Sequence, residues 1–548
     1  MSIKESIVRS AIWSAYGDAL GFITELTDKK GLKHRAGSLE IRELTNWTRK
    51  IGGLSGTFVD FPAGIYSDDT QLRLATSRAI NADGYFDVEA FAKIELPVWL
   101  SYCLGAGRGT KAAASNLIRN DINWFSNFYR DKNLDYFQSG GNGAVMRIQP
   151  HVWGNLNSDV EGVLLDVFRN SICTHGHPRG ILGACFHALF LLHVFNHKVV
   201  PSIDDWYKIA KNLIIVPDII EDDMQIATFW KPTWESQTGK TFKEAVKETI
   251  IEILDDIRLL ETSYNQSCTP YHQYISALDL LGGYDPKQRG SGTKTALLAS
   301  FLSLLFIDTP QEAMLTAVNQ LGSDTDTIAT IAGAILGALS ENLPNEKLID
   351  QKYIEKEAMR IGDLNSGTTD SEFSYPDLFG WQAPKRLSDA LDGLNDKYMI
   401  KGLGVSRSIG KPLIIGKKES LRWLWIQTSY GQTCLIRIKE KLPEINGSIV
   451  NPKYVYLKDT PIKDNPKDTN SLQDTQQDLL TSQNPNKCVE NNQPVDIETL
   501  TMRTINLGLK ARDIGNDIRK MLDDGRTIEE LVAYTAIISK ADKNNEKG

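Results

Sequence analysis

The chain has 548 residues, which is too many for one hydrophobic core, so we expect at least two domains. Its residues are 41% hydrophobic and 24% charged, a composition typical of a soluble globular protein. Its net charge of -8 argues against a nucleic-acid surface over the whole molecule, although it leaves room for a local basic patch. The six cysteines lie far apart and the N-terminal residues are too charged for a secretory signal, so we expect a cytoplasmic protein.

Residues 1–345 are predicted to be predominantly helical, because apolar residues recur at helical spacing, as at Ile7, Ala11 and Ala15. Glycine-rich breaks separate these helices and strand-like alternation is scarce, which favours an all-α bundle whose loops carry the chemistry. Two helices, over 180–195 and 328–339, are almost entirely apolar and are predicted to be buried centrally. The first is too short an apolar run to span a membrane.

The loop Ser67-Asp68-Asp69-Thr70 precedes one predicted helix, and Ser323-Asp324-Thr325-Asp326-Thr327 precedes another. Ser and Asp at such positions are ordinary helix N-caps. A cap needs only one acceptor, whereas each loop carries two carboxylates, and crowded carboxylates raise one another's pKa unless a cation neutralises them. Oxygen ligands suit hard cations such as Mg2+, so the two loops predict a binuclear Mg2+ site if they meet in space.

Glycine-rich loops provide candidate anion sites. In Ser139-Gly140-Gly141-Asn142-Gly143, backbone N–H groups can approach and encircle an anion, although most such loops are simple turns. The loop lacks the lysine of a P-loop, so hydrolysis of nucleoside triphosphates is not indicated. The segment Gly105-Ala106-Gly107-Arg108-Gly109 is a second candidate phosphate contact.

Two further segments carry polar residues with open roles. Cys173 to His177 has no second Cys/His pair at zinc-ligand spacing, so His175 is predicted either to hydrogen-bond a ligand at a helix start or to be a satisfied loop histidine. Gly17-Asp18-Ala19-Leu20-Gly21 indicates a helix packed closely against another backbone. Asp18 and Glu25 on one face form either a solvated acidic face or part of a catalytic site.

Beyond residue 345 the composition changes. Short strands are predicted over 412–415, 421–428 and 433–439, and two amphipathic helices over 499–540 with a turn near Asp524-Gly525. The predicted organisation is a helical domain at 1–345, a connecting region at 346–400, a small β-rich module at 401–462, a flexible polar linker at 463–495 and a helical C-terminal segment at 496–545.

Together these motifs resemble the ADP-ribosylglycohydrolase family over about the first 345 residues, and leave about the last 150 outside the resemblance. The matching pieces, in the family's order, are Gly17 to Gly21 with Glu25, Ser67 to Thr70, Gly140 to Arg147, Thr174 to Pro178, and Gly322 to Thr327.

The resemblance implies an all-α catalytic domain with two Mg2+ ions, for which Mn2+ is a substitute. The ions would hold the ribose hydroxyls of an ADP-ribosyl group, and Glu25 would lie at the metal entrance. The implied metal ligands are Ser67, Asp68, Asp69, Asp324, Asp326 and Thr327; the implied catalytic residues are Glu25, Asp69 and Asp324; and the implied substrate-binding residues are Gly105, Gly107, Ser139, Gly140, Gly141, Asn142, Gly143 and His175.

The chain departs from the family pattern without losing a ligand. Ser323 stands where a second glycine is usual, and Ile328 where Asn or Ser is common. Gly292-Thr293 occupies the place of a frequent Gly-Tyr pair, so the aromatic residue on the adenine side is missing or comes from elsewhere.

The leading hypothesis is therefore a Mg2+-dependent hydrolase that cleaves the glycosidic bond at C1″ and releases ADP-ribose from a modified protein, nucleic acid or small molecule. Glu25 and Asp69 are both candidates for the general acid. The alternatives are a non-catalytic ADP-ribose sensor with the same fold and a metallohydrolase of phosphoester bonds. No membrane partner is expected, and residues 400–548 are candidates for selecting a macromolecular target.

Overall fold

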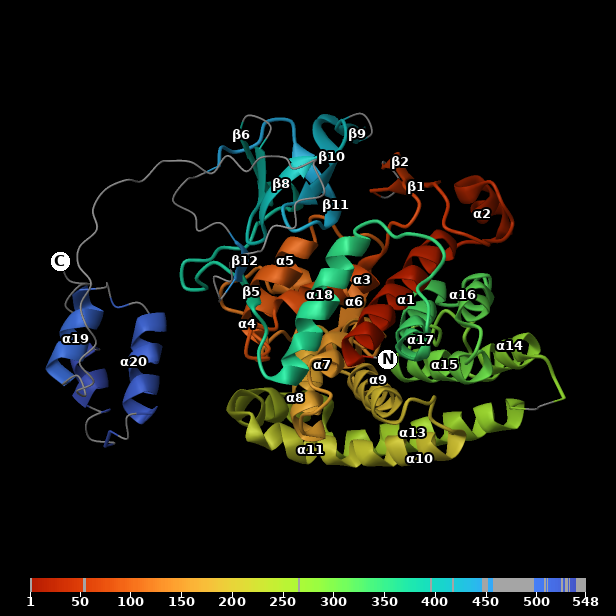
Figure 1. The fold of residues 1–548 in the computed structure, drawn as a ribbon, viewed down its shortest axis with the longest axis horizontal. Helices are drawn as coiled ribbons and strands as arrows, with labels where there is room; N and C mark the ends of the chain where they lie inside the picture. Colours follow the sequence, from red (N-terminus) through yellow and green to blue (C-terminus); the bar gives the residue numbers. More distant parts are fainter. Residues whose placement is uncertain are drawn as a thin grey trace. The chain divides into compact units, whose positions relative to one another are not determined.

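The computed structural model divides the chain into two compact units, Met1–Pro461 and Ile462–Gly548. The first unit is a bundle of helices that carries a small antiparallel β-sheet (Figure 1). The residues that the structure describes are 2–52, 56–264, 267–394, 397–415, 418–445, 452–456, 497–506, 509, 511–523, 526–527, 531 and 533–538.

Helices α1 (Ile3–Thr24) and α17 (Thr325–Leu339) pack against each other at the centre of the first unit. Their backbones nearly touch, because a Cβ atom on Gly17 would lie 2.4 Å from the carbonyl oxygen of Ala329, and one on Gly21 would lie 2.4 Å from the Cα of Asp326. Only glycine permits this approach. The predicted close packing is confirmed, and it brings the end of α1 to the start of α17, where the second acidic loop lies.

Helix α9 (Pro178–His197) is the second apolar core helix predicted from the sequence. Contrary to the expectation from the sequence, this helix is long and apolar enough to span a membrane, but 89% of the apolar stretch is buried inside the protein. Burial against α8 and α15 explains its composition.

The remaining helices surround this core, and those with polar outer faces bury one apolar stripe each. The other α-helices of the first unit are α2 (Lys29–Ala36), α3 (Asp68–Arg78), α4 (Val88–Ala90), α5 (Leu96–Trp99), α6 (Arg108–Asn116), α7 (Gln149–Trp153), α8 (Val160–Ile172), α10 (Ile203–Asn212), α11 (Val216–Ile219), α12 (Lys231–Thr238), α13 (Phe242–Ser263), α14 (Pro270–Leu280), α15 (Gly292–Leu305), α16 (Pro310–Val318) and α18 (Gln351–Asp363). Short 3-10 or π-helical turns are η1 (Phe91–Glu95), η2 (Tyr136–Gln138), η3 (Val145–Arg147), η4 (Leu213–Ile215), η5 (Ile220–Asp222), η6 (Ile226–Trp230), η7 (Leu364–Ser366) and η8 (Leu387–Asp389).

The region expected to be all-α also contains strands. β1 (Trp47–Ile51) and β2 (Thr57–Phe61) form an antiparallel hairpin in which Trp47 faces Phe61 and the two rings stack at 4.7 Å. A second, two-residue pair joins β3 (Arg130–Asp131) to β4 (Leu134–Asp135). These hairpins correct the sequence-based expectation. β1 has two apolar residues, β2 three, β3 none and β4 only Leu134, and tertiary contacts rather than alternation stabilise them.

The β-rich module predicted after residue 400 belongs to one antiparallel sheet in the order β11-β10-β8-β7-β6, with β9 paired to β10, and the first two strands of this sheet along the chain precede residue 401. Its predicted strands at 412–415, 421–428 and 433–439 are confirmed as β9, β10 and β11. The strands are β6 (Leu391–Leu394), β7 (Lys397–Ile400), β8 (Gly404–Ser408), β9 (Leu413–Ile415), β10 (Lys418–Thr428) and β11 (Thr433–Lys439), with β5 (Ser371–Ser374) and β12 (Lys453–Tyr456) paired separately.

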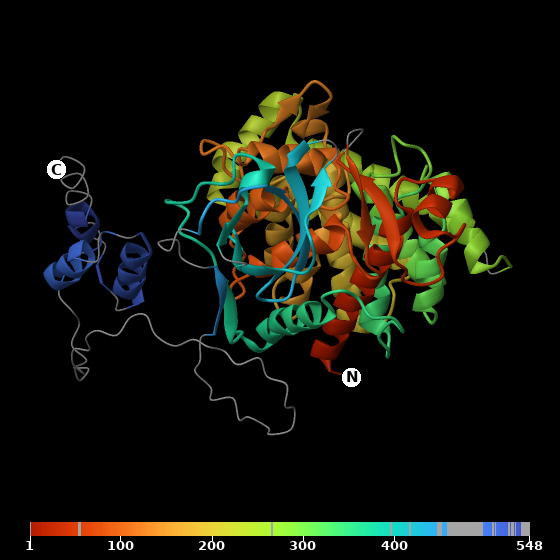
Figure 2. The same ribbon diagram turned by 90° about the horizontal axis from the view of Figure 1, so that it is seen from above.

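Buried polar contacts join this module to the helices. The Asp350 carboxylate accepts hydrogen bonds from the backbone N–H and the hydroxyl of Thr433, and Arg78 at the end of α3 donates to Gln432 Oε1 at 2.7 Å. Helix α18, in the predicted connecting region, runs beside α1 (Figures 1 and 2). The proposed domain boundaries remain a prediction, but the described residues up to 456 pack as one body.

The second unit contains helices α19 (Ile497–Asn506) and α20 (Ala511–Asp523). Leu500, Met521, Tyr534 and Ile538 form its own small core. Two amphipathic helices on either side of a turn near Asp524-Gly525 were predicted here; instead, α19 and α20 both precede that turn, and residues 533–538 are also helical. The predicted polar linker at 463–495 and the turn at Asp524-Gly525 lie outside the described residues.

Candidate functional site

The two acidic loops meet at one cavity of about 550 Å³, although they are far apart in the sequence. The Thr327 hydroxyl of the second loop lies 3.4 Å from Asp69 Oδ2 of the first. Every residue predicted for the site lines this cavity except Ser67 and Gly105, which lie behind its wall. The predicted residues that line it are Glu25, Asp68, Asp69, Gly107, Ser139, Gly140, Gly141, Asn142, Gly143, His175, Asp324, Asp326 and Thr327.

Asp18 fixes the first acidic loop through hydrogen bonds to its backbone. This wholly buried residue of α1 accepts hydrogen bonds from the backbone N–H groups of Ser67 and Thr70, each at 2.9 Å. Asp18 is thus neither a solvated acidic face nor a cavity residue. It supplies the acceptors for the first turn of α3, so Asp68 and Asp69 are not needed as caps.

Asp69 is the most buried of the cavity carboxylates, at 1% exposure. Its Oδ2 lies 3.3 Å from the Ser67 hydroxyl, whereas its Oδ1 is buried and has no hydrogen-bond partner among the described residues. A buried carboxylate oxygen without a donor is costly. Its position between the two loops suits a ligand that carries positive charge.

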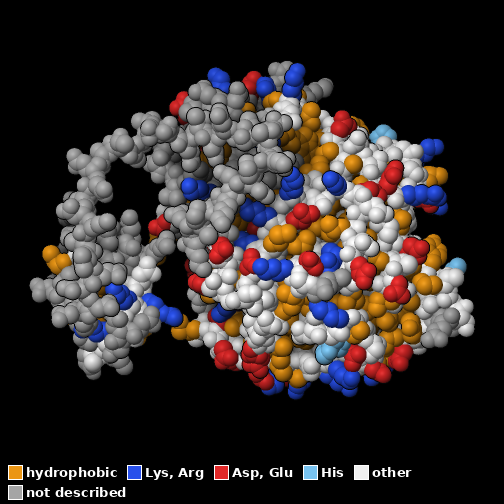
Figure 3. All heavy atoms as spheres, viewed as in Figure 1, with side chains coloured by type: hydrophobic (Ala, Val, Ile, Leu, Met, Phe, Trp, Pro, Cys, Tyr) orange, Lys and Arg blue, Asp and Glu red, His pale blue; other side chains and the backbone are white. Residues whose placement is uncertain are grey.

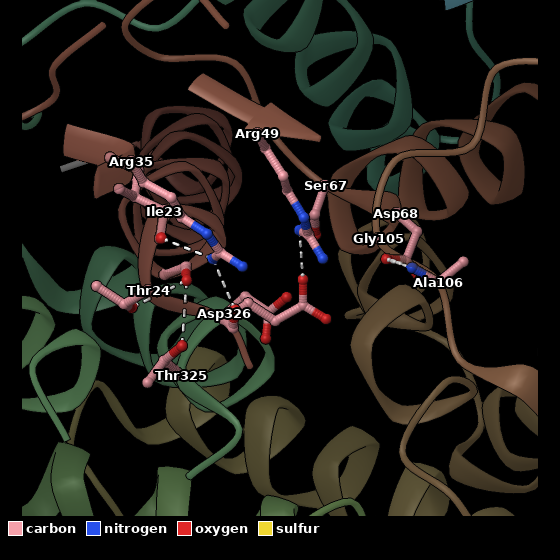
Figure 4. Close-up of polar contacts among 12 residues, drawn as sticks. Ile23, Thr24, Arg35, Arg49, Ser67, Asp68, Gly105, Ala106, Thr325 and Asp326 are labelled. Carbon is pink, nitrogen blue, oxygen red and sulfur yellow. Dashed lines mark hydrogen bonds and ion pairs between the residues drawn. The ribbon is translucent and has the colours of Figure 1, made fainter. Parts of the chain in front are cut away.

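Asp68 is fixed by the neighbouring loop before α6. Its Oδ1 accepts the Ala106 N–H at 2.6 Å, and its own N–H donates to the Leu104 carbonyl at 2.8 Å (Figure 4). Gly105 has a φ of +81°, and a Cβ there would lie 2.6 Å from Asp68 Oδ1. Glycine is therefore required at 105 for loop shape, which differs from the phosphate contact that the resemblance implied.

The second loop presents its carboxylates in the same way. Asp324 is the N-cap residue of α17, yet its side chain makes no capping hydrogen bond. Its Oδ2 instead accepts from Asn142 Nδ2 at 3.0 Å, which ties the acidic loop to the glycine-rich loop. Asp326 Oδ1 accepts the backbone N–H of Thr327 at 3.0 Å. The ordinary capping interpretation therefore does not account for these carboxylates.

Burial and mutual repulsion raise the pKa values of the carboxylates in this cluster. Burial, followed by repulsion from Glu25, raises the pKa of Asp68 to about 8. Burial is also the main cause that raises the pKa of Asp69 and of Asp326 well above the usual range, with neighbouring carboxylates adding to it. The buried Arg73 lies close enough to Asp18 and Asp69 to interact with both charges, but a single guanidinium does not balance the cluster.

Glu25 lies at the end of α1, where it is the C-cap residue. Arg49 of β1 forms an ion pair with its carboxylate at 3.0 Å, and Arg35 of α2 donates to its backbone carbonyl at 2.8 Å (Figure 4). Arg35 also donates to the Ile23 carbonyl at 3.0 Å. The hairpin that the sequence did not reveal thus positions a predicted catalytic residue.

The glycine-rich loop forms the opposite wall. The Asn142 N–H donates to the Gly290 carbonyl at 2.9 Å, and the Gly292 N–H donates to the Gly140 carbonyl at 3.0 Å, so the loop is fixed against the start of α15. A Cβ on Gly143 would lie 2.7 Å from the Thr110 hydroxyl and 2.9 Å from His175 Cε1. A side chain at Gly143 would therefore not fit in this wall, and the anion that the loop is predicted to bind remains a prediction.

His175 is 4% exposed, and its Nδ1 lies 2.7 Å from the Thr174 hydroxyl. Burial, with repulsion from Arg147, lowers the pKa of His175 to about 3. The imidazole is therefore neutral near pH 7, so it can take part in hydrogen bonds but carries no charge.

Sequence reasoning missed several cavity residues, most notably Leu26 and Arg289. Arg289 Nη1 donates to the Gly322 carbonyl at 3.1 Å, beside the second acidic loop. Its position next to the Gly290 break was the only sequence signal. The described residues that line the cavity include no Phe, Tyr or Trp, consistent with Gly292-Thr293 in place of the Gly-Tyr pair.

The donor set fits a hard cation by its chemistry. Among the described residues, no three His, Cys, Asp or Glu side chains form a closed metal site of their own. Mg2+ does not require one, because it retains several waters and binds through few protein oxygens. Buried carboxylates with raised pKa values, one unpaired Asp69 oxygen and adjacent hydroxyls provide such oxygens.

Comparison with known proteins agrees with this geometry. The family model for ADP-ribosylglycohydrolase matches residues 2–369. A solved structure described as an "ADP-ribosylglycohydrolase-related protein complex" is 18% identical, covers 66% of this chain and 98% of its own, and has a TM-score of 0.40, too low to carry an argument. No curated protein matches. The chain therefore belongs to the ADP-ribosylglycohydrolase family, a family of hydrolases.

Proposed function

We propose that the protein is a Mg2+-dependent hydrolase that cleaves the glycosidic bond at C1″ of an ADP-ribosyl group and releases ADP-ribose. The observation that carries the proposal is the convergence of two buried acidic loops, whose charge the protein itself does not balance, on a cavity with a glycine-rich wall. The family supports hydrolysis in general. The metal and the substrate are our proposal.

The residues that would hold two Mg2+ ions are those of the two loops. When bound, Mg2+ supplies positive charge that orients the ribose hydroxyls and lowers the pKa of a water molecule. Asp18 would keep the first loop in place through its two 2.9 Å hydrogen bonds. Asn142 would hold Asp324 in the same manner from the glycine-rich side. The proposed ligands are Ser67, Asp68, Asp69, Asp324, Asp326 and Thr327.

The opposite wall suits a diphosphate. Helices α6 and α15 both begin at the cavity, and neither Gly107 nor Ser291 caps its helix with a side-chain hydrogen bond. Their first-turn N–H groups and positive dipole ends favour an anion. The glycines at 140, 141 and 143 would let the phosphates approach the backbone, and the neutral His175 would hydrogen-bond the phosphate or ribose.

Cleavage at C1″ builds positive charge on the ribose, which nearby carboxylates such as Asp69 and Asp324 stabilise. Glu25 and Asp69 remain the two candidates for donating a proton to the leaving group. Glu25 lines the cavity where its ion pair with Arg49 fixes it, whereas Asp69 lies deeper.

The test is release of ADP-ribose from substrates with arginine, serine and nucleobase linkages, measured by mass spectrometry with MgCl2 and then with EDTA. We expect release from at least one linkage with MgCl2 and none with EDTA. Binding of ADP-ribose without release from any of them would favour the non-catalytic sensor, and release that persists in EDTA would contradict the metal assignment. A phosphorylated product other than ADP-ribose would indicate a phosphoester hydrolase.

The target, a location in the cytoplasm and a role of residues 400–548 in target selection remain part of the proposal. The mostly buried apolar helix α9 is consistent with a soluble protein.

A further inference from the structure

A second hollow, of about 610 Å³, lies on the β-rich module between η8, the start of β10 and the end of β11. All its lining residues lie beyond residue 369, where the family match ends, so the family assigns it no role. We call it the β-module pocket, and it is lined by Arg386, Leu387, Ser388, Leu421, Arg437, Lys439, Glu440 and Lys441.

Positive charge dominates the β-module pocket. Lys439 forms an ion pair with Asp389, and Glu440 is paired with Arg422, so the only lining carboxylate is already neutralised. Arg386, Arg437 and Lys441 have no acidic partner within the described part of the chain. In a protein of net charge -8, a pocket with three unpaired cations is a local exception.

Arg437 is the fixed member of the three. It lies on β11 directly opposite Trp423 of β10, and its backbone N–H donates to the Ser101 carbonyl at 3.2 Å. The Arg437 Nε and the Trp423 indole nitrogen are both buried donors without an acceptor among the described residues. Native proteins rarely leave such buried donors unpaired, so both donors favour an acceptor supplied by a ligand.

We infer that the β-module pocket binds the phosphate groups of an anionic ligand. A guanidinium presents a planar fork that matches phosphate oxygens, and the exposed Arg386 and Lys441 add flexible cations around it. Leu421 and Leu387 provide an apolar wall for the rest of the ligand. The volume is that of a site for a small molecule or a short piece of a polymer.

The position of the pocket links it to the first site without depending on the proposed function. Ser101, which accepts the Arg437 N–H, begins the segment whose Leu104 and Ala106 hold Asp68. Both basic and acidic side chains are visible along the upper edge of the molecule in Figure 3, where Figure 1 shows the strands of the module. Two sources of phosphate fit the chemistry, a free polyphosphate and the backbone of a single-stranded nucleic acid.

The test uses the full chain and two probes at about 50 mM salt, a labelled single-stranded oligonucleotide of about 12 nucleotides and inorganic tripolyphosphate. The double variant R386E/K441E changes two exposed side chains, so it is expected to fold. The matched control K397E/K411E makes the same charge change at exposed lysines of the same module that do not line the pocket.

We expect saturable binding of at least one probe, weakened at least about tenfold by R386E/K441E and less than about twofold by K397E/K411E. The milder variant R437Q should weaken the same probe. Binding of the oligonucleotide alone would identify nucleic acid as the source, and binding of tripolyphosphate alone a free anion. No saturable binding of either probe, or equal weakening by both double variants, would overturn the inference.

Discussion

Two regions of this protein bury several charged groups, but only one of them pairs its buried charges with charges of opposite sign. At the seam between helices and sheet, Arg78 and Glu95 are both fully buried, and the guanidinium donates to the two carboxylate oxygens at 2.7 and 2.8 Å. At the cavity, Asp69 and Asp326 are equally buried but face other carboxylates.

The difference separates a structural site from a ligand site. Arg78 also donates to Tyr353 and Gln432, and Glu95 accepts from Tyr375, so the seam pairs its buried charges with protein partners. The cavity has an unpaired Asp69 oxygen and repelling carboxylates instead. Buried charge that the fold does not balance requires a proton or a cation from outside. The following predictions test that contrast.

The largest effect on stability is expected at the seam. Glu95→Gln removes the negative partner and leaves the buried Arg78 charge unpaired, which should lower the free energy of unfolding by about 3–5 kcal/mol. Chemical denaturation measures this effect. Tyr375→Phe, which removes one hydrogen bond to Glu95, is the matched control and should cost about 1 kcal/mol. A loss for Glu95→Gln no greater than that for Tyr375→Phe would show that the pair is not essential.

The largest effect on activity is expected at the second acidic loop. Asp324→Asn keeps the shape of the side chain but removes its charge, and should lower kcat/KM for ADP-ribose release by roughly 10²–10³-fold. Circular dichroism should show an intact fold. Asp308→Asn, at an exposed residue that does not line the cavity, is the control and should leave kcat/KM unchanged. Full activity of Asp324→Asn would remove that residue from the mechanism.

Because the carboxylates of the cavity are not balanced by positive charge, we predict that in EDTA the protein becomes less stable as the pH rises. Because Asp68 has a pKa raised to about 8 in the fold and about 3.9 when unfolded, the folded state binds the proton more tightly. Its contribution to stability is therefore present at low pH and is lost as pH rises from about 4 to about 8. Saturating Mg2+ at 100 times its Kd should restore about 2.7 kcal/mol at pH 8.

Thermal unfolding of wild type and of Asp68→Asn, at pH 5 and pH 8, measures this linkage. The asparagine variant should show a smaller fall in Tm between the two pH values, because the titrating group is gone. An equal fall in both proteins would assign the pH dependence to other groups.

The smallest effect is expected from removal of the second unit. A chain that ends at Pro461 retains the contacts of Gln432 and Thr433 to the helices, and should keep the Tm and small-substrate turnover of the full chain. A chain that ends before residue 400 lacks those contacts and leaves Arg78 short of one acceptor, so it should unfold at lower denaturant concentration. Equal stability of both truncations would show that the contacts of Gln432 and Thr433 contribute nothing.

Local sequence patterns were enough to predict the helical class, the buried α9 and α17, the strands after residue 412 and all the carboxylates that line the cavity. These depend on local pattern: helical spacing, alternation, and carboxylates in excess of what a cap requires. The glycines of α1 also predicted a close helix contact, because a missing Cβ has few other uses in a helix.

The contacts between these elements could be seen only in the folded protein. That Asp18 holds the first loop, that Arg49 of an unexpected hairpin pairs with Glu25, and that Arg437 lacks an acceptor all depend on contacts between residues far apart in sequence. Periodicity shows which side of an element is buried, but not what lies against it. Whether a buried charge is balanced is a property of its neighbours in space, and the fold alone supplies them.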